Sequence, residues 1–169
     1  MDETTISLRF PLRQCWRKRG LPMKVPAPTD FRHYHHLIGA YNWHSDDVSA
    51  LAVAVKNSQA FSEFLEYLLV DCYPTQRLLL VMDNAGYHHS APVKAALSLF
   101  QPRVRVICLP PRCPDLNPIE RYWRHLKDLA CANKLFLDLE SLAAAVGQIL
   151  VAQNQPGHPL RFEFLKDLS

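Results

Sequence analysis

One short apolar run, residues 78–82, constrains the fold of this 169-residue chain more than any other feature. The run reads L-L-L-V-M and shows no alternation between polar and apolar residues. Such a segment is typical of a strand that is buried on both faces of an α/β sheet. It ends at Asp83-Asn84-Ala85-Gly86, whose residue types favour a turn. The run therefore predicts a central strand, with helices on both faces of its sheet.

Alternation of apolar and polar residues predicts three strands before this run. Ile6, Leu8 and Phe10 alternate with polar residues in the first segment. Residues 36–43 and 48–55 are two further candidate strands, joined by an S-D-D turn. An antiparallel succession is the simplest arrangement of the three.

The period then changes to that of a helix. The apolar residues at helical spacing are Phe61, Phe64, Leu65, Leu68 and Leu69, with Ser58 as the expected N-cap. The later predicted elements are a helix over 92–100, a strand over 104–109, a helix from Pro118 and a helix over 139–151. The residues expected to face inward in the last helix are Leu139, Leu142, Ala143, Val146 and Ile149 or Leu150. The order βββαβαβα indicates the α/β class, with a mixed sheet compatible with a ribonuclease H-like fold. We expect one domain over 1–155, followed by a tail over 156–169.

Composition and charge exclude several classes of protein. Hydrophobic residues make up 49% of the chain and charged residues 21%, which excludes a disordered or fibrous chain. Nineteen Lys and Arg against sixteen Asp and Glu give a net charge of +3, too small by itself to indicate a nucleic-acid partner. Five cysteines without a C-x-x-C pair argue against a disulfide framework and a zinc knuckle. The chain begins without a signal peptide and lacks the ~20-residue apolar run that spans a bilayer, so we expect a cytoplasmic protein with no membrane partner.

Three acidic positions are candidates for chemistry, and each has a structural alternative. Asp83 follows the apolar strand, where the functional sites of open α/β sheets lie, but Asp is also an ordinary turn residue. Glu120 lies in the first turn of a helix that Asn117 is expected to cap, and this spacing equally favours a capping box. Asp2 and Glu3 begin the first strand, where a solvated terminus is the simpler interpretation.

Taken together, the three positions favour a metal site. Mg²⁺ prefers oxygen ligands, and a pair of such ions assists displacement at phosphorus. Asp2, Asp83 and Glu120 meet this requirement if the first strand lies beside the strand over 78–82.

Two longer strings resemble a known family. They are L-L-L-V-M-D-N-A-G-Y-H over 78–88 and V-I-C-L-P-P-R-C-P-D-L-N-P-I-E-R-Y-W-R-H-L-K over 106–127. Both resemble the DDE transposases, in the bacterial insertion-sequence branch of the mariner superfamily. M-D-E-T at the start, R-x-x-W-x-x-x-G over 13–20 and L-I-G-A over 37–40 are similar to that family's first strand, hairpin and third strand. Cys113 stands where the family usually has Ser.

The resemblance implies that Asp2, Asp83 and Glu120 are the catalytic triad and that they bind two Mg²⁺ or Mn²⁺ ions. It implies cleavage of DNA at the transposon ends, followed by attack of the freed 3′-hydroxyl on target DNA. A homodimer is also expected. Family members usually carry an N-terminal helix-turn-helix region, which does not precede Asp2 here. We therefore expect the catalytic part of a transposase, either a fragment or a second reading frame, and in the second case a helix-turn-helix part that is encoded separately.

Further residues are expected to support this site. Asn84 and His88 match the family motif and are expected to orient Asp83 or to contact DNA, although His88 is equally well explained as a packed turn residue. The candidate DNA-binding residues are Arg13, Arg17, Lys18, Arg19, Arg121, Arg124 and Lys127, with Asn117 as a further supporting residue. The alternatives are a solvated hairpin face for the first four and an i, i+4 pair with Glu120 for Arg124. The histidines at 33, 35, 36 and 44 lack a Cys or carboxylate at zinc-ligand spacing.

Two other functions stay open. One is a non-catalytic remnant of a transposase that binds DNA or a partner protein. The other is a stand-alone ribonuclease H-like nuclease, which would cut RNA–DNA hybrids or unrelated duplexes without strand transfer.

Overall fold

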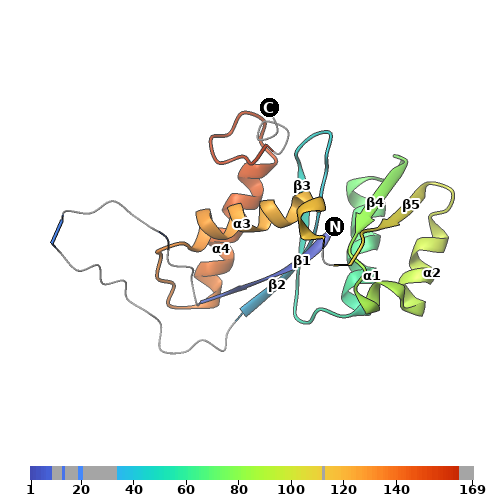
Figure 1. The fold of residues 1–169 in the computed structure, drawn as a ribbon, viewed down its shortest axis with the longest axis horizontal. Helices are drawn as coiled ribbons and strands as arrows, with labels where there is room; N and C mark the ends of the chain where they lie inside the picture. The colour runs from blue at the N-terminus through green and yellow to red at the C-terminus, as the bar shows by residue number, and fades with distance from the viewer. Residues whose placement is uncertain (9–12, 14–18, 21–33, 112, 164–169) are drawn as a thin grey trace.

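The elements of the chain follow the predicted order. The structure is a computed structural model, and it describes residues 1–8, 13, 19–20, 34–111 and 113–163. The strands are β1 (Asp2–Ser7), β2 (Tyr34–Tyr41), β3 (Val48–Val53), β4 (Leu78–Met82) and β5 (Val104–Cys108). The α-helices are α1 (Ser58–Glu66), which continues as the π-helix η1 (Tyr67–Cys72), α2 (Ala91–Leu99), α3 (Pro118–Cys131) and α4 (Leu139–Gln153). Short 3₁₀ helices η2 (Gly86–His89) and η3 (Pro114–Leu116) precede α2 and α3. The predicted succession βββαβαβα is confirmed (Figure 1).

β1, β2 and β3 form an antiparallel sheet that is covered on both faces. Neighbouring strand residues face opposite sides, so Leu37 packs with α3 and α4 whereas Ile38 packs with α1. The α3–α4 core includes the buried residues Ile6, Leu37, Val48, Ile119, Tyr122, Trp123, Leu126, Leu142 and Val146. The α1–α2 core includes Met1, Ile38, Phe61, Phe64, Leu65, Leu68, Leu69, Leu80, Met82, Val93 and Val104.

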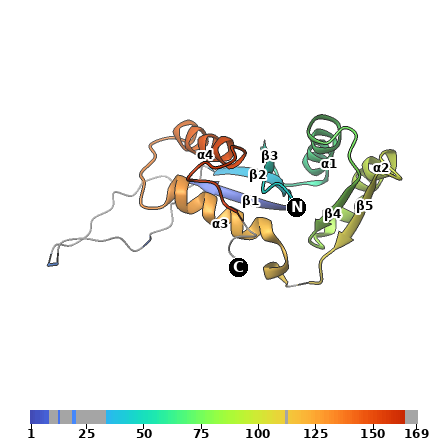
Figure 2. The ribbon, with the colours of Figure 1, turned by 90° about the horizontal axis from the view of Figure 1, so that it is seen from above.

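β4 and β5 form a separate parallel pair. Figures 1 and 2 show this pair and α2 at one end of the molecule, beside the three-stranded sheet. Within the described residues no ladder joins β1 to β4. The amino group of Met1 instead donates one hydrogen bond, of 2.5 Å, to the carbonyl of Val81. The start of β1 therefore lies beside β4 through a single main-chain contact.

The outer face of β4 corrects one prediction. Leu80 and Met82 are buried in the α1–α2 core, but Leu79 is 59% exposed and Ile107 on β5 is 49% exposed. Both α1 and α2 pack on the same face of this pair, and no described helix packs on the other. The prediction that the strand over 78–82 is buried on both faces is therefore wrong for its outer face.

The helices show the predicted buried faces, with two local corrections. The five apolar residues predicted for the helix after β3 are all fully buried. Its N-cap is Asn57 rather than Ser58, because the Asn57 side chain accepts a 2.9 Å hydrogen bond from the amide of Ala60. In α4 the prediction for Ala143 is wrong, since this residue is exposed at the edge of an apolar cavity. No helix in the described part of the chain is long and apolar enough to cross a membrane.

The residues that follow α4 fold back onto it. The buried side-chain amide of Gln153 both donates to and accepts from the main chain of Phe162, at 2.8 Å in each case. Arg161 pairs with Asp47 in the β2–β3 turn at 3.1 Å. The described part of the expected tail is thus held against the domain, and the boundary at 155 stays a prediction.

Candidate active site

β1 supplies the first acidic residue, Asp2. Asp2 pairs with Gly39 of β2, and alternation along β1 places Asp2 and Thr4 on the face that α3 covers. A cavity of about 310 Å³ opens at this point. Its lining residues are Asp2, Thr4, Glu120, Trp123, Arg124 and Lys127. β1 and α3 therefore bring Asp2 and Glu120 to one cavity.

Gly39 allows α3 to lie close to the sheet beside Asp2. A Cβ atom at Gly39 would lie 2.6 Å from Cη2 of Trp123, which is closer than carbon atoms can approach. The indole of Trp123 therefore occupies the space that any other side chain at position 39 would need. Because Trp123 is one turn after Glu120 on α3, this contact also fixes the helix that carries Glu120.

Asn117 joins the start of α3 to the start of β1. Among the described residues its side chain forms no capping hydrogen bond, so the predicted cap is wrong, although Asn117 does stand at the N-cap position. The Asn117 side chain is buried, and its Nδ2 donates a 3.0 Å hydrogen bond to the carbonyl of Met1. A capping box with Glu120 is therefore excluded. This hydrogen bond ties the start of α3, which carries Glu120, to the residue before Asp2.

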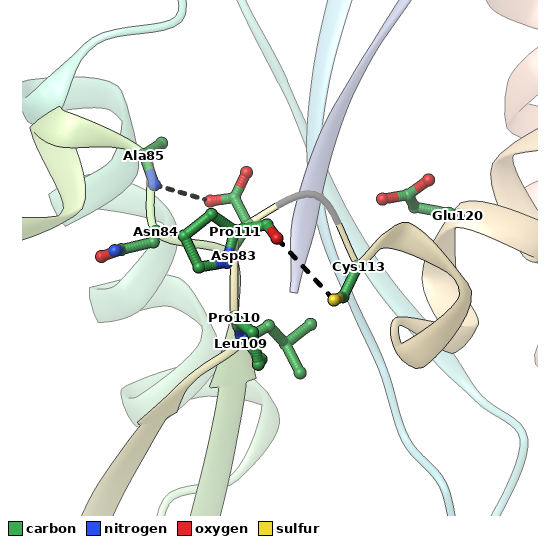
Figure 3. A pocket seen from close by; sticks show the side chains of 8 residues that line it. All are labelled: Asp83, Asn84, Ala85, Leu109, Pro110, Pro111, Cys113 and Glu120. Carbon is green, nitrogen blue, oxygen red and sulfur yellow. Dashed lines mark hydrogen bonds between the residues drawn. The ribbon is translucent and has the colours of Figure 1, made fainter.

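Asp83 stands directly after β4, at the edge of a second cavity of about 400 Å³. The residues that line it are Asp83, Asn84, Ala85, Leu109, Pro110, Pro111, Cys113 and Glu120. Figure 3 shows the carboxyl groups of Asp83 and Glu120 on opposite sides of this cavity. Glu120 lines both cavities and is the residue that the Asp2 cavity and the Asp83 cavity have in common.

The carboxylates influence one another electrostatically. Burial raises the pKa of Asp2 to about 6, and the charges of Glu3, Glu120 and Asp83 add to this effect, against a main-chain hydrogen bond that lowers it. Burial also raises the pKa of Glu120, helped by Asp115 and Asp83 and opposed by Arg124. Like charges that raise each other's pKa indicate a site where a cation would be favourable.

The carboxylate oxygens of these acids suit a divalent cation, although they do not form a complete coordination shell. Carboxylate oxygens are the ligands that Mg²⁺ and Mn²⁺ prefer. Within the described residues, no three His, Cys, Asp or Glu side chains lie close enough together to hold one ion. Mg²⁺ is commonly held by only one or two carboxylates, with water and substrate phosphate completing its shell. The open arrangement is compatible with that mode of binding.

Of the two residues that follow Asp83 in the family motif, only His88 contacts it. His88 is buried, and its Nδ1 lies 3.0 Å from Oδ1 of Asp83. The side chain of Asn84 instead contacts Nε2 of His89 and points away from Glu120 (Figure 3). His88 is thus both a packed turn residue and a partner of Asp83, whereas the Asn84 side chain has turned to His89.

Two of the predicted DNA-binding residues lie at the site. Arg124 and Lys127 line the Asp2 cavity. Burial lowers the pKa of Lys127, and the charge of Asp2 opposes this shift. Arg121 lies on the same helix and is exposed. The helix thus presents cations beside the carboxylates.

The basic residues before β2 lie elsewhere or outside the described residues. Nε of Arg13 pairs with Oδ1 of Asp128 at 2.7 Å, toward the C-terminal end of α3. Arg19 is exposed in a turn, and Arg17 and Lys18 lie outside the described residues. Because Arg13 pairs with Asp128, its predicted contact with DNA stays a proposal.

Sequence reasoning grouped Glu3 with Asp2 and did not find its partner. Alternation turns Glu3 to the opposite face of β1 from Asp2, where Oε1 lies 3.0 Å from Nε2 of His88. The signal available in the sequence was the alternation itself, which separates two adjacent acids onto two faces. The residue on the other face, 85 positions away in sequence, could not be identified without the fold.

Comparison with known proteins agrees with this geometry. Residues 1–143 match the family described as DDE superfamily endonuclease. The insertion element IS630 uncharacterized 39 kDa protein of Shigella sonnei is 30% identical over 132 residues, which are 78% of this chain and 38% of that protein. The uncharacterized protein y4pE/y4sA of Sinorhizobium fredii (strain NBRC 101917 / NGR234) is 31% identical over 64 residues, 38% of this chain and 44% of that protein. The chain therefore spans less than half the length of these curated relatives.

Solved structures share the fold. The Mos1 transposase paired-end complex with the left transposon end has a TM-score of 0.73 at 19% identity, over 99% of this chain and 50% of that chain. The Mos1 strand transfer complex has a TM-score of 0.68 at 18% identity, over 89% of this chain and 45% of that chain. These similarities confirm the ribonuclease H-like fold. Because the family match covers most of the chain, this protein belongs to the DDE superfamily endonucleases and is similar to the IS630 protein and the Mos1 mariner transposase.

Proposed function

We propose that this chain carries out metal-dependent DNA strand cleavage and strand transfer as the catalytic part of an insertion-sequence transposase. One observation supports this function most directly. Asp2, Asp83 and Glu120 come from β1, the end of β4 and the first turn of α3, and they line two cavities that share Glu120.

Asp2, Asp83 and Glu120 are the residues that would hold divalent cations. When bound, Mg²⁺ or Mn²⁺ would supply charge stabilisation for an in-line displacement at phosphorus. Without a cation the three carboxylates repel one another, and the raised pKa of Asp2 reflects this together with burial. Occupation by cations would relieve that repulsion.

Cations on α3 would position the DNA backbone. Arg124 and Lys127 follow Glu120 by four and seven residues, so they share one side of the helix with it. Both line the Asp2 cavity, where a phosphate could lie between the basic side chains and the carboxylates. In this arrangement α3 would bind DNA and align the scissile bond.

The partners in this proposal are DNA at the transposon ends and at the target. A helix-turn-helix part would read the ends, and two copies of the chain would bring two ends together. The printed descriptions of the Mos1 structures, a paired-end complex and a strand transfer complex, are consistent with this function.

The test uses purified protein, Mn²⁺ and duplex DNA that carries the ends of the encoding element. We expect strand cleavage and joining that Asp83→Ala abolishes and that the exposed control Asp71→Ala retains. DNA binding without cleavage would support the non-catalytic remnant instead. Cutting of RNA–DNA hybrids without strand transfer would support the stand-alone nuclease.

A further inference from the structure

Glu3 is a buried acid that the catalytic triad does not use. Its side chain is only 7% exposed, on the face of β1 opposite Asp2. Burying a carboxylate is costly unless a charged or hydrogen-bonding partner accompanies it. The partner here is His88, whose Nε2 lies 3.0 Å from Oε1 of Glu3.

His88 contacts two acids at once. Its Nδ1 lies 3.0 Å from Oδ1 of Asp83 and 3.2 Å from the main-chain oxygen of the same residue. The imidazole is fully buried, with the ring of Phe61 at 4.2 Å and the ring of Tyr87 at 4.6 Å between centroids. Neighbouring rings therefore fix the plane of the imidazole, and both of its nitrogens point at oxygen atoms.

Polar neighbours stabilise the carboxylate of Glu3. Burial raises the pKa of Glu3, but hydrogen bonds from His88 and Tyr87 and the charge of His88 outweigh burial and lower it. Oε1 of Glu3 and Oδ1 of Asp83 are both acceptors, so the ring of His88 bridges the two acids by donating from both of its nitrogens. The three side chains form one connected polar chain, which we call the Glu3–His88–Asp83 strut.

The strut crosses the boundary between the two sheets. Glu3 belongs to β1, next to Asp2, whereas His88 and Asp83 follow β4. The main-chain contact described at this boundary is the hydrogen bond from Met1 to Val81, and the side chains of Met1 and Ile38 share an apolar core with those of β4. Because no ladder joins β1 to β4 in the described residues, the strut is well placed to set where Asp83 lies relative to Asp2.

We propose that Glu3 and His88 are positioning residues that hold Asp83 in its metal-binding orientation. Oδ1 of Asp83 accepts from the amide of Ala85 at 3.1 Å and also faces Nδ1 of His88, which leaves Oδ2 for a cation. Glu3 acts through His88, since it fixes the ring that fixes Asp83. The inference rests on the proposed function, because it assigns a role toward the same cation.

The experiment measures Mn²⁺ binding to the purified chain, with the electron paramagnetic resonance signal of free Mn²⁺ as the readout. We expect Glu3→Gln, which preserves the size of the side chain, to weaken Mn²⁺ binding by roughly 10- to 100-fold. His88→Gln should weaken it to a similar extent. The double variant should bind Mn²⁺ only slightly less tightly than the single variant that binds it less tightly, because both substitutions act through one contact. The matched control is Glu63→Gln, at an exposed glutamate on α1, which should bind Mn²⁺ like the wild type.

Two comparisons separate the strut from the proposed function. Circular dichroism first establishes which variants are folded, and if one single variant unfolds, the other decides. If Asp83→Asn loses Mn²⁺ while folded Glu3→Gln or His88→Gln binds it as tightly as wild type, the strut is overturned and the proposed function stands. If the wild type binds no Mn²⁺, or Asp83→Asn binds it unchanged, both the proposed function and the strut are overturned.

Discussion

The two halves of the candidate site are held by different kinds of contact. Asp2 and Glu120 stand on the α3–α4 core, where apolar side chains pack the helix against the three-stranded sheet. Asp83 stands at the end of the other sheet, where the amide of Ala85 and the ring of His88 hold its carboxylate. One pair of acids is therefore placed by packing, and the third acid is placed by polar contacts.

This difference indicates which of the three acidic side chains is displaced most easily. Truncation of a packed aromatic side chain costs about 3–5 kcal/mol, whereas a typical hydrogen bond contributes about 0.5–1.5 kcal/mol. The spacing between Asp2 and Glu120 is thus fixed by the larger energy. The two sheets themselves share the α1–α2 core, so the smaller energies act on the orientation of the Asp83 carboxylate at the end of β4.

The largest effect is expected where the two halves meet, at Glu120. Glu120→Gln should lower metal-dependent DNA cleavage by at least about 100-fold, because it removes a charge that both cavities share. A nicking assay on supercoiled plasmid measures this. The control is Glu140→Gln, which changes an exposed acid in the first turn of α4. Equal activity of Glu120→Gln and wild type would exclude Glu120 from the catalytic site.

The stability of the packed half should depend on the size of the side chain at position 39. Gly39→Ala places a methyl group against Trp123 and should lower the free energy of unfolding by about 1–3 kcal/mol. It should also displace α3, and Glu120 with it. Urea denaturation measures the first effect and the nicking assay the second.

Gly147→Ala is the matched control for this substitution. A Cβ at Gly147 meets nothing within 4 Å, and the residue lies inside α4. Alanine there should leave stability unchanged or raise it by about 0.5–1 kcal/mol, because it favours the helix. Similar losses for both glycine variants would argue against close packing at Gly39.

The sequence predicted most of the packed half of the site. On α3, Ile119, Trp123 and Leu126 recur at i, i+4 and i+7, a spacing that indicates one buried face, and all three are buried. Helical spacing is a local property, so a single sequence reveals it. The order of the elements followed in the same way from local periods and turn residues.

Contacts between residues far apart in the sequence could not be predicted, whereas the contact of His88 with Asp83 was expected from the family motif. Asn117 favoured a helix cap by residue type, but its side chain bonds to residue 1, which lies 116 positions away in sequence. The partner of Glu3 and the split into two sheets likewise depend on tertiary contacts. Leu79 shows the same limit, since an unbroken apolar run does not reveal that one strand face stays uncovered.

The pH dependence of stability should distinguish Asp2 from an ordinary surface acid. Asp2 has a pKa of about 6 in the folded chain against 3.8 as the ordinary value, so the folded chain holds this proton more tightly. The contribution of Asp2 to the free energy of unfolding is therefore present below pH 4 and is lost as the pH rises to about 6. Above that pH and without metal, Asp2→Asn should have a Tm a few degrees higher than wild type.

Thermal unfolding between pH 4 and pH 8 measures this difference. Mn²⁺ should raise the Tm of the wild type above pH 6 more than it raises that of Asp2→Asn, because a cation that binds the folded chain stabilises it. Identical pH profiles for the two proteins would mean that burial and the neighbouring acids do not raise the pKa of Asp2.

The smallest effect is expected at Arg13, an exposed residue that pairs with the C-terminal part of α3. Arg13 and Asp128 form an exposed ion pair, and such pairs contribute about 0–1 kcal/mol. Arg13→Ala should therefore change the free energy of unfolding by less than about 1 kcal/mol in urea denaturation. A larger loss would indicate that the segment around Arg13 is part of the packed half.

The hydrogen bond from Asn117 has a consequence for how this protein tolerates mutation. Its acceptor is the peptide oxygen of residue 1, which every amino acid possesses. The anchor for α3 therefore depends on where the chain runs and not on which side chain stands there. The side chain of residue 1 takes no part in this hydrogen bond, whereas position 117 needs a side chain that can donate one.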